Sequence, residues 1–337
     1  MGYNRNLAMD AAKFVAALLV IGIHTAVFSD LNSTIYFAFV QIICRTAVPF
    51  FAVCTGYYIG TRVSFRNRLE KTEANRAAFF RQWKKILTLY AVWTGLYLLF
   101  SIPFWIQTGW FSPIAFVDYA FAALTGGSHY HLWYLLYLLY SLPVVYLLLR
   151  WVPQRHHRLL IGSLWAIAII SYTYKSFLPE RLLECLTPVE RFSTLPVLPP
   201  LILTGVYISK EVKRSKRFYA VGLLISSILL LAEAFLLRYS GIEKVSFIIF
   251  TLPTAYFLFH LILELPSPLV NSYAGLLGKI STFVYCVHPM FIETAGRVSN
   301  NSVVTYLIVA FLSVISSYTY YLLKGKLNKK KDISCFN

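Results

Sequence analysis

The chain has 337 residues, of which 58% are hydrophobic and 17% aromatic, and its mean hydropathy is +0.62. Only 13% of the residues are charged, whereas a water-soluble globular protein carries roughly 25%. This composition excludes an ordinary soluble domain and favours a protein that lies in a lipid bilayer. The net charge of +17 comes without any motif typical of nucleic-acid binding.

Apolar runs of about 20 residues predict ten membrane-spanning helices. Their approximate ranges are 8–28, 35–60, 83–105, 131–150, 158–175, 194–209, 217–237, 245–264, 273–295 and 302–323. The segment 107–130 is also apolar, but Gly109, Pro113 and the pair Gly126-Gly127 interrupt it, and we interpret it as an interfacial loop. The predicted fold is an all-α, polytopic membrane domain that occupies residues 1–337, with no fused soluble domain.

Lys and Arg are distributed unevenly between the predicted loops. Twenty-three lie at the N-terminus or in loops on its side of the membrane, and six lie in the opposite loops. Cytoplasmic loops carry the excess of positive charge, so both termini are predicted to be cytoplasmic. A basic cytoplasmic face also attracts anionic lipid head groups. We therefore expect a multi-pass protein of a cell membrane that needs no nucleic acid as a partner.

The first predicted span contains three ionisable residues in an apolar run, MDAAKFVAALLVIGIHTAVF, Met9 to Phe28. At about 100° per residue, Lys13 and His24 lie on one helical face, about 16 Å apart along the axis. Asp10 precedes Lys13 by three residues, within pairing distance. Such groups are costly in a membrane unless they face protein or water, so they predict a buried polar seam. The alternative is a pair of juxtamembrane charges and a packing histidine.

Arg45 also lies inside a predicted span, ten residues from its start. Its partner could be Asp10, a phosphate or an acceptor molecule. Pro49 follows four residues later and removes a backbone donor, which predicts a bent helix.

The opening helix resembles the membrane-bound acyltransferase-3 family, which has an acidic residue, a basic residue and, after ten more residues, a histidine. The family usually has Arg in place of Lys13. The resemblance continues, in the family's order, in RTAVPFFAVCTGYYI (45–59), FFRQWKKILTLYAVW (79–93), HLWYLLYLLYSLP (131–143), LPPLILTGVYI (198–208) and ISTFVYCVHPMFI (280–292). The chain is also similar to the membrane part of the serine racemases of vancomycin-resistant bacteria, which carry an additional racemase domain.

The resemblance implies transfer of an acyl group, usually acetyl from cytoplasmic acetyl-CoA, to a hydroxyl of a cell-surface glycan or a related acceptor. Acetyl-CoA would be the donor substrate, and no bound cofactor is expected. The membrane would be the bacterial inner or plasma membrane. The five cysteines show no paired spacing, so we expect no metal site. Two alternatives stay open. One is a transporter, although we find no inverted repeat. The other is a serine-uptake module like the membrane half of the racemases.

The catalytic candidates are His24, Lys13 and Asp10. His24 would be the general base, or a transient acyl carrier, because imidazole titrates near neutral pH. The remaining candidates are binding residues. For the phosphates of acyl-CoA they are Arg81, Lys84 and Lys85, at the edge of the basic loop 61–85, together with Arg45.

Lys84 replaces the second Arg of the family's Arg-x-x-Arg, and this loop could equally be a plain membrane anchor. The candidates for acceptor binding are His131, Trp133, Tyr134, Arg191 and His288. Aromatic rings stack on sugar faces, but the same residues suit an interfacial aromatic belt. Arg191 could be a solvated loop charge, and His288 a packing residue.

Overall fold

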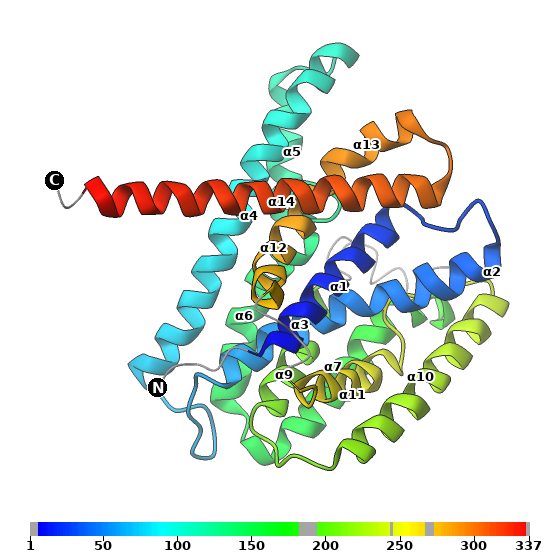
Figure 1. Cartoon of the computed structure of the whole chain (residues 1–337). Coiled ribbons are helices and arrows are strands. Elements are labelled where there is room, and N and C mark those ends of the chain that lie inside the picture. The colour runs from blue at the N-terminus through cyan, green and yellow to red at the C-terminus, as the bar shows by residue number, and fades with distance from the viewer. Residues whose placement is uncertain (1–5, 182–193, 243–244, 267–272, 335–337) are drawn as a thin grey trace. The chain divides into compact units, whose positions relative to one another are not determined.

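A computed structural model of the chain describes residues 6–181, 194–242, 245–266 and 273–334. In these residues the regular structure is helical, apart from an isolated bridge between Phe65 and Leu69 (Figure 1). The helices form two compact units. The first unit is Met1–Val48 with His260–Asn337, and the second unit is Pro49–Phe259.

The first unit is built around the N-terminal helix and the C-terminal helices. Its elements are α1 (Leu7–His24), α2 (Ser33–Tyr36), a π-helix (Phe37–Ile43), a 3-10 helix (Cys44–Thr46), α12 (Tyr273–Val287), α13 (Pro289–Val298) and α14 (Ser302–Ser334). α1 packs along α12, and both α12 and α13 pack against α14. Asp30, in the loop after α1, accepts hydrogen bonds from the backbone N–H and the hydroxyl of Ser302. This carboxylate therefore satisfies donors at the start of α14.

The second unit contains the middle of the chain. Its helices are α3 (Ala47–Gly60), α4 (Glu73–Thr108), α5 (Pro113–Thr125), α6 (Trp133–Trp151), α7 (His157–Tyr172), α9 (Leu198–Ile208), α10 (Lys216–Tyr239) and α11 (Thr251–Leu263). α6 packs against α4 and α9, and α7 packs against α9. Glu233 of α10 is buried and accepts hydrogen bonds from the backbone N–H groups of Ile249 and Phe250, at 2.7 and 3.0 Å. This charged group holds the N-terminal end of α11.

Six helical segments of the described residues are long and apolar enough to cross a membrane: Leu7–His24, Ser33–Gly60, Glu73–Thr108, Trp133–Trp151, Lys216–Tyr239 and Ser302–Lys324. A seventh is added if the pair Gly275–Val287 and Pro289–Val298, bent by 68°, forms one span. The all-helical prediction is confirmed for the described residues. The count of ten spans and the cytoplasmic termini stay predictions.

The prediction of a loop for residues 107–130 is wrong in its middle part, which is the helix α5. The residues that we interpreted as interruptions lie at the ends of helices. Gly109 has a φ of 74° and ends α4, Pro113 is at the start of α5 after the capping hydroxyl of Ser112, and Gly126 follows the last residue of α5. Proline is tolerated in the first helical turn because its missing N–H has no partner there.

Two backbone carbonyls without a helical partner accept a hydrogen bond from a tryptophan side chain. Pro143, inside α6, frees one of them because proline has no N–H to donate. Trp83 Nε1 donates to the carbonyl of Leu139, four residues before Pro143, at 3.1 Å. Trp165 Nε1 donates at 3.2 Å to the carbonyl of Ile249, which lies in the turn before α11. Lipid offers no donors, so these bonds satisfy groups that would otherwise be costly to bury.

Candidate functional site

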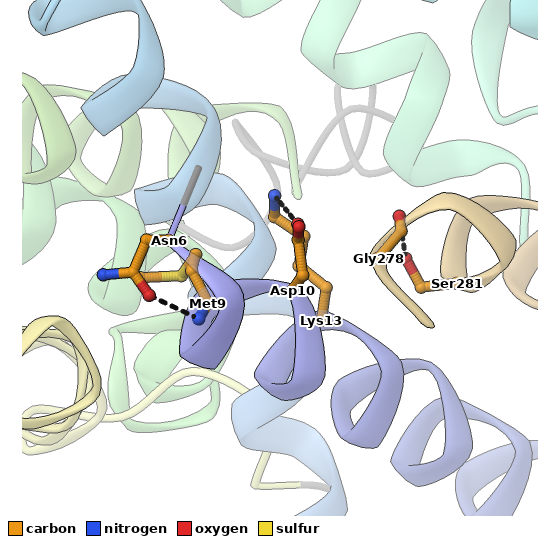
Figure 2. Close-up of polar contacts among 6 residues, drawn as sticks. All are labelled: Asn6, Met9, Asp10, Lys13, Gly278 and Ser281. Atoms are coloured by element: carbon orange, nitrogen blue, oxygen red, sulfur yellow. Dashed lines mark hydrogen bonds and ion pairs between the residues drawn. The ribbon is translucent and has the colours of Figure 1, made fainter. Parts of the chain in front are cut away.

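The polar seam predicted for the first span begins with an ion pair on α1. Lys13 Nζ lies 3.3 Å from Asp10 Oδ1, as the spacing of three residues predicted (Figure 2). The Asp10 side chain is 7% exposed and that of Lys13 is 21% exposed. Asn6 caps α1, because its Oδ1 accepts a hydrogen bond from the Met9 N–H at 2.9 Å. A charge pair with this burial is expensive to break, because the group left behind stays desolvated.

α12 approaches Asp10 through a glycine. A Cβ built on Gly278 would lie 2.3 Å from Asp10 Oδ1 and 2.5 Å from Asp10 Cβ, distances that real side chains do not adopt. The turn is held by Ser281, whose hydroxyl donates to the carbonyl of Gly278 at 3.0 Å (Figure 2). Gly278 therefore allows α12 to cover the ion pair, a requirement that the sequence pattern did not indicate.

His24, the last residue of α1, lies against His288. The two imidazole centroids are 5.3 Å apart with an interplanar angle of 27°. His24 is half-buried and His288 is fully buried, at the break between α12 and α13. His288 was a candidate for acceptor binding, and the structure brings it to the catalytic candidate from a distant part of the sequence.

The backbone sets the tautomer of His288. Pro289 frees the carbonyl of Tyr285, four residues before it, and His288 Nδ1 lies 2.8 Å from that oxygen. A carbonyl can only accept, so Nδ1 carries the proton, and in the neutral ring Nε2 is the basic nitrogen. The His-Pro pair thus produces both the helix break and a defined imidazole.

Arg45 heads a polar chain within the first unit. Its Nε donates to Gln41 Oε1 at 2.7 Å, and Gln41 Nε2 donates to the Tyr36 hydroxyl at 3.1 Å. Gln41 was not among the partners considered for Arg45, although an amide four residues earlier in an apolar helix is a signal that could have indicated it. These residues flank or lie in the π-helix Phe37–Ile43, and π-helical turns are frequent at functional sites.

The basic candidates Arg81, Lys84 and Lys85 lie in the second unit, on the first half of α4, and all three are exposed. Trp83, between them, fixes this turn through its bond to α6. The preceding loop is ordered by Asn75, which is 1% exposed and bonds to the backbone N–H and carbonyl of Ser64 at 2.9 and 3.0 Å. The cations are therefore presented by a fixed loop and helix turn.

His131 and its neighbours form an aromatic cluster in the second unit. His131 is 1% exposed, its Nδ1 lies 3.1 Å from Nδ1 of His129, and the ring of Tyr97 stacks on His129 at 4.3 Å. Burial lowers the pKa of His129 to about 4. Trp133 is half-buried and Tyr134 is buried, so only part of the cluster is accessible for binding.

Arg191 lies outside the described residues. Among the described residues, no group of three His, Cys, Asp or Glu side chains is arranged to hold a metal ion. The arrangement on α1 instead offers two adjacent imidazoles at one end of the helix and a buried ion pair at the other.

The acyltransferase-3 family model, described as an acyltransferase domain, matches residues 6–322. The chain belongs to this family. It is 25% identical, over 96% of its length, to an amino-acid racemase of Enterococcus faecalis, and 26% identical, over 92%, to a serine/alanine racemase of Enterococcus gallinarum. These matches cover 46% and 45% of the two relatives, so the chain spans about half their length. No solved structure gives a significant match.

Proposed function

We propose that this family member is an integral membrane O-acyltransferase. It moves an acyl group, acetyl in the simplest case, from cytoplasmic acyl-CoA to a hydroxyl of a cell-surface glycan or a related acceptor, with His24 as the general base. Membership of the family supports acyl transfer in general. One observation carries the residue assignment. His24 contacts His288, and His24 lies on α1, the helix that also holds the Asp10–Lys13 pair.

In the proposed reaction, His24 removes the proton of the acceptor hydroxyl while the hydroxyl oxygen attacks the thioester carbonyl carbon. The tetrahedral oxyanion collapses, the carbon–sulfur bond breaks, and the CoA thiolate leaves. The imidazolium of His24 then protonates the thiolate, which restores the base. General base catalysis of this kind contributes about 10²–10⁴-fold to the rate.

His288 supports this role as a positioning residue. Its Nδ1–H is held by the carbonyl of Tyr285, so its Nε2 can accept a hydrogen bond from the acceptor hydroxyl or from His24. Lys13, which pairs with Asp10, is proposed to bind the polar end of the donor. In the second unit, Arg81, Lys84 and Lys85 are the proposed contacts for the phosphates of the donor.

A second candidate function is an amino-acid-handling module of the membrane, such as a serine-uptake unit. The observation that favours it is the similarity to an amino-acid racemase and a serine/alanine racemase. Both functions would place polar groups inside the bilayer. They differ in outcome, because uptake moves an unchanged substrate whereas acyl transfer releases a free thiol.

The test is thiol release from acetyl-CoA by the purified chain in nanodiscs, with a panel of hydroxyl acceptors, in parallel with serine uptake into proteoliposomes. We expect thiol release from the wild-type chain, and a loss of about 10²-fold or more in His24→Ala. His156→Ala is the matched control, because His156 is an exposed histidine outside this unit. Full activity of His24→Ala contradicts the proposed base, and serine uptake without thiol release favours the second candidate.

Substitutions of Lys13 separate donor binding from catalysis. Lys13→Ala should weaken donor binding and leave Asp10 without this partner, whereas Lys13→Arg, the usual family residue, should retain both functions. Donor affinity is measured by calorimetry and turnover by thiol release. Equal damage from the two substitutions in both quantities would show that Lys13 has only a structural role.

A further inference from the structure

A cavity of about 680 Å³ lies in the second unit, between α7, α9, α11 and the loop that joins α9 to α10. Its polar lining includes Arg158, Lys210, Arg214, Glu211, Tyr207 and Tyr256. Small-molecule sites commonly have volumes of roughly 300–1,000 Å³. The loops 150–158 and 210–217 belong to the side that the Lys and Arg distribution predicts to be cytoplasmic, so the cavity is expected to open there.

Arg158 is oriented by an aromatic neighbour. Its Nε donates to the Tyr207 hydroxyl at 2.5 Å, and its guanidinium carbon lies 5.4 Å from the centroid of the Tyr207 ring. This bond takes one of the five N–H groups of an arginine. A cation held in this way differs from a solvated charge that only anchors a loop, because little ordering is needed when a ligand binds.

Lys210 adds a partly desolvated cation. Its Nζ donates to the carbonyl of Val63 at 2.7 Å, and burial lowers the pKa of Lys210. Among the described residues of the lining, Glu211 is the one carboxylate, and it accepts a hydrogen bond from the Tyr256 hydroxyl at 2.7 Å. With Arg158 and Arg214, the lining carries three cations against one carboxylate, and an anion would stabilise the charged form of Lys210.

The lining also has an apolar part. Ile161, Phe218, Leu252 and Pro253 contribute to the same cavity as the charged residues. An inorganic anion would contact the cations but would leave this apolar surface in contact with water. A ligand that contains both an anionic group and an organic body would use the whole cavity.

We propose that this cavity binds a phosphate ester of a small organic molecule. Arginine is suited to phosphate because its planar N–H groups donate in pairs, and basic pockets between membrane helices bind lipid phosphates. The ester can come from the head group of an anionic phospholipid or from a soluble nucleotide, including the phosphorylated ribose of a coenzyme. The site is assigned from the second unit alone and does not depend on acyl transfer at His24.

The experiment uses the purified full chain in two arms. In the soluble arm, adenosine 3′,5′-bisphosphate is titrated by calorimetry into the chain in zwitterionic nanodiscs. In the lipid arm, native mass spectrometry counts phosphatidylglycerol retained by the chain relative to phosphatidylcholine. We expect Arg158→Gln with Arg214→Gln to lower affinity for the bound probe by roughly tenfold for each arginine. The control pair, Arg155→Gln with Lys216→Gln, removes the same charge outside the lining and should retain binding.

Each outcome decides the proposal. Loss of bisphosphate binding in the lining variant alone supports a nucleotide site, and loss of phosphatidylglycerol alone supports a lipid site. Absence of both probes from the wild-type chain, or equal weakening in the lining and control pairs, overturns it. If the double variant does not fold, Arg214→Gln is tested alone, because the bond from the Arg214 backbone N–H to Tyr219 does not involve its side chain. His24→Ala should bind as wild type, so this test is independent of the proposed reaction.

Discussion

Replacing Gly278 with alanine tests the contact between α12 and the ion pair of α1. The added Cβ would lie 2.3, 2.4 and 2.5 Å from Oδ1, Cγ and Cβ of Asp10, whereas ordinary contact begins at 3.4 Å. The nearest atoms must therefore separate by about 1 Å. Rotation of the Asp10 carboxylate cannot relieve the clash, because the Cβ atom of Asp10 is itself too close. The two helices must move apart, and the cover of the Asp10–Lys13 pair is lost.

The expected magnitude follows from two opposing effects. Alanine is preferred over glycine inside a helix by roughly 0.5–1 kcal/mol, so propensity alone predicts a stabilised protein. Overpacking of a buried contact costs about 1–3 kcal/mol. The clash should win, and Gly278→Ala should lower the free energy of unfolding. Gly296→Ala, in α13, is the matched control, because its Cβ meets no atom within 4 Å and should give only the favourable effect.

The measurement is the free energy of unfolding of both variants in the same nanodiscs, together with thiol release from acetyl-CoA. A third variant, Asp10→Gly, removes the Cβ that causes the clash. In that background Gly278→Ala should become neutral or stabilising, since the two substitutions share one contact. If Gly278→Ala stabilises the wild-type chain as much as Gly296→Ala does, α12 does not lie this close to Asp10 and the geometry of the seam is wrong.

Three further predictions concern other parts of the chain. Trp83→Phe should lower the free energy of unfolding by about 1–3 kcal/mol, because the Leu139 carbonyl loses its donor. The control Trp151→Phe, at an exposed tryptophan, should not lower it, and equal losses in the two variants would contradict this prediction. Burial lowers the pKa of His129 from 6.5 to about 4, so between these two pH values the unfolded chain binds more protons than the folded chain. The free energy of unfolding should therefore fall as the pH drops from 6.5 to about 4. His129→Gln should reduce this pH dependence, and an unchanged dependence would refute the prediction. A single cysteine at Arg68, in a chain without its native cysteines, should be labelled only from the cytoplasm, and outside labelling would reverse the predicted topology.

The local part of the candidate site could be predicted from sequence. Asp10 and Lys13 are three residues apart, and helical geometry alone brings such residues together. The contact of His24 with His288 could not be derived in this way, because it depends on how α1 packs along α12 and α14. Gly278 gave no signal either, since a glycine in an apolar helix has the same appearance whether it faces lipid or an aspartate.

The sequence also predicts that the apolar segments are helical, but it does not predict whether a glycine or proline interrupts a segment or lies at the end of a helix. In the segment 107–130, the glycines and prolines were interpreted as interruptions of one unit, whereas they mark where α4 ends and α5 begins and ends. The sequence shows where the glycines and prolines are. The capping geometry decides whether the helix lies before or after such a residue. An example is Ser112, which caps the helix that begins at Pro113.

Two prolines of this chain, Pro143 and Pro289, suggest how a membrane protein can hold a defined imidazole. Each removes a backbone donor, and in lipid the freed carbonyl must find another. For Pro143 the donor is the indole of Trp83, which ties two helices together and has no acid–base chemistry. For Pro289 the donor is the imidazole of His288, so the same backbone requirement fixes the proton on Nδ1 and leaves Nε2 as the basic nitrogen beside His24. Replacing His288 with tryptophan could keep a donor but would remove that base, which is why the identity of the donor matters at this proline.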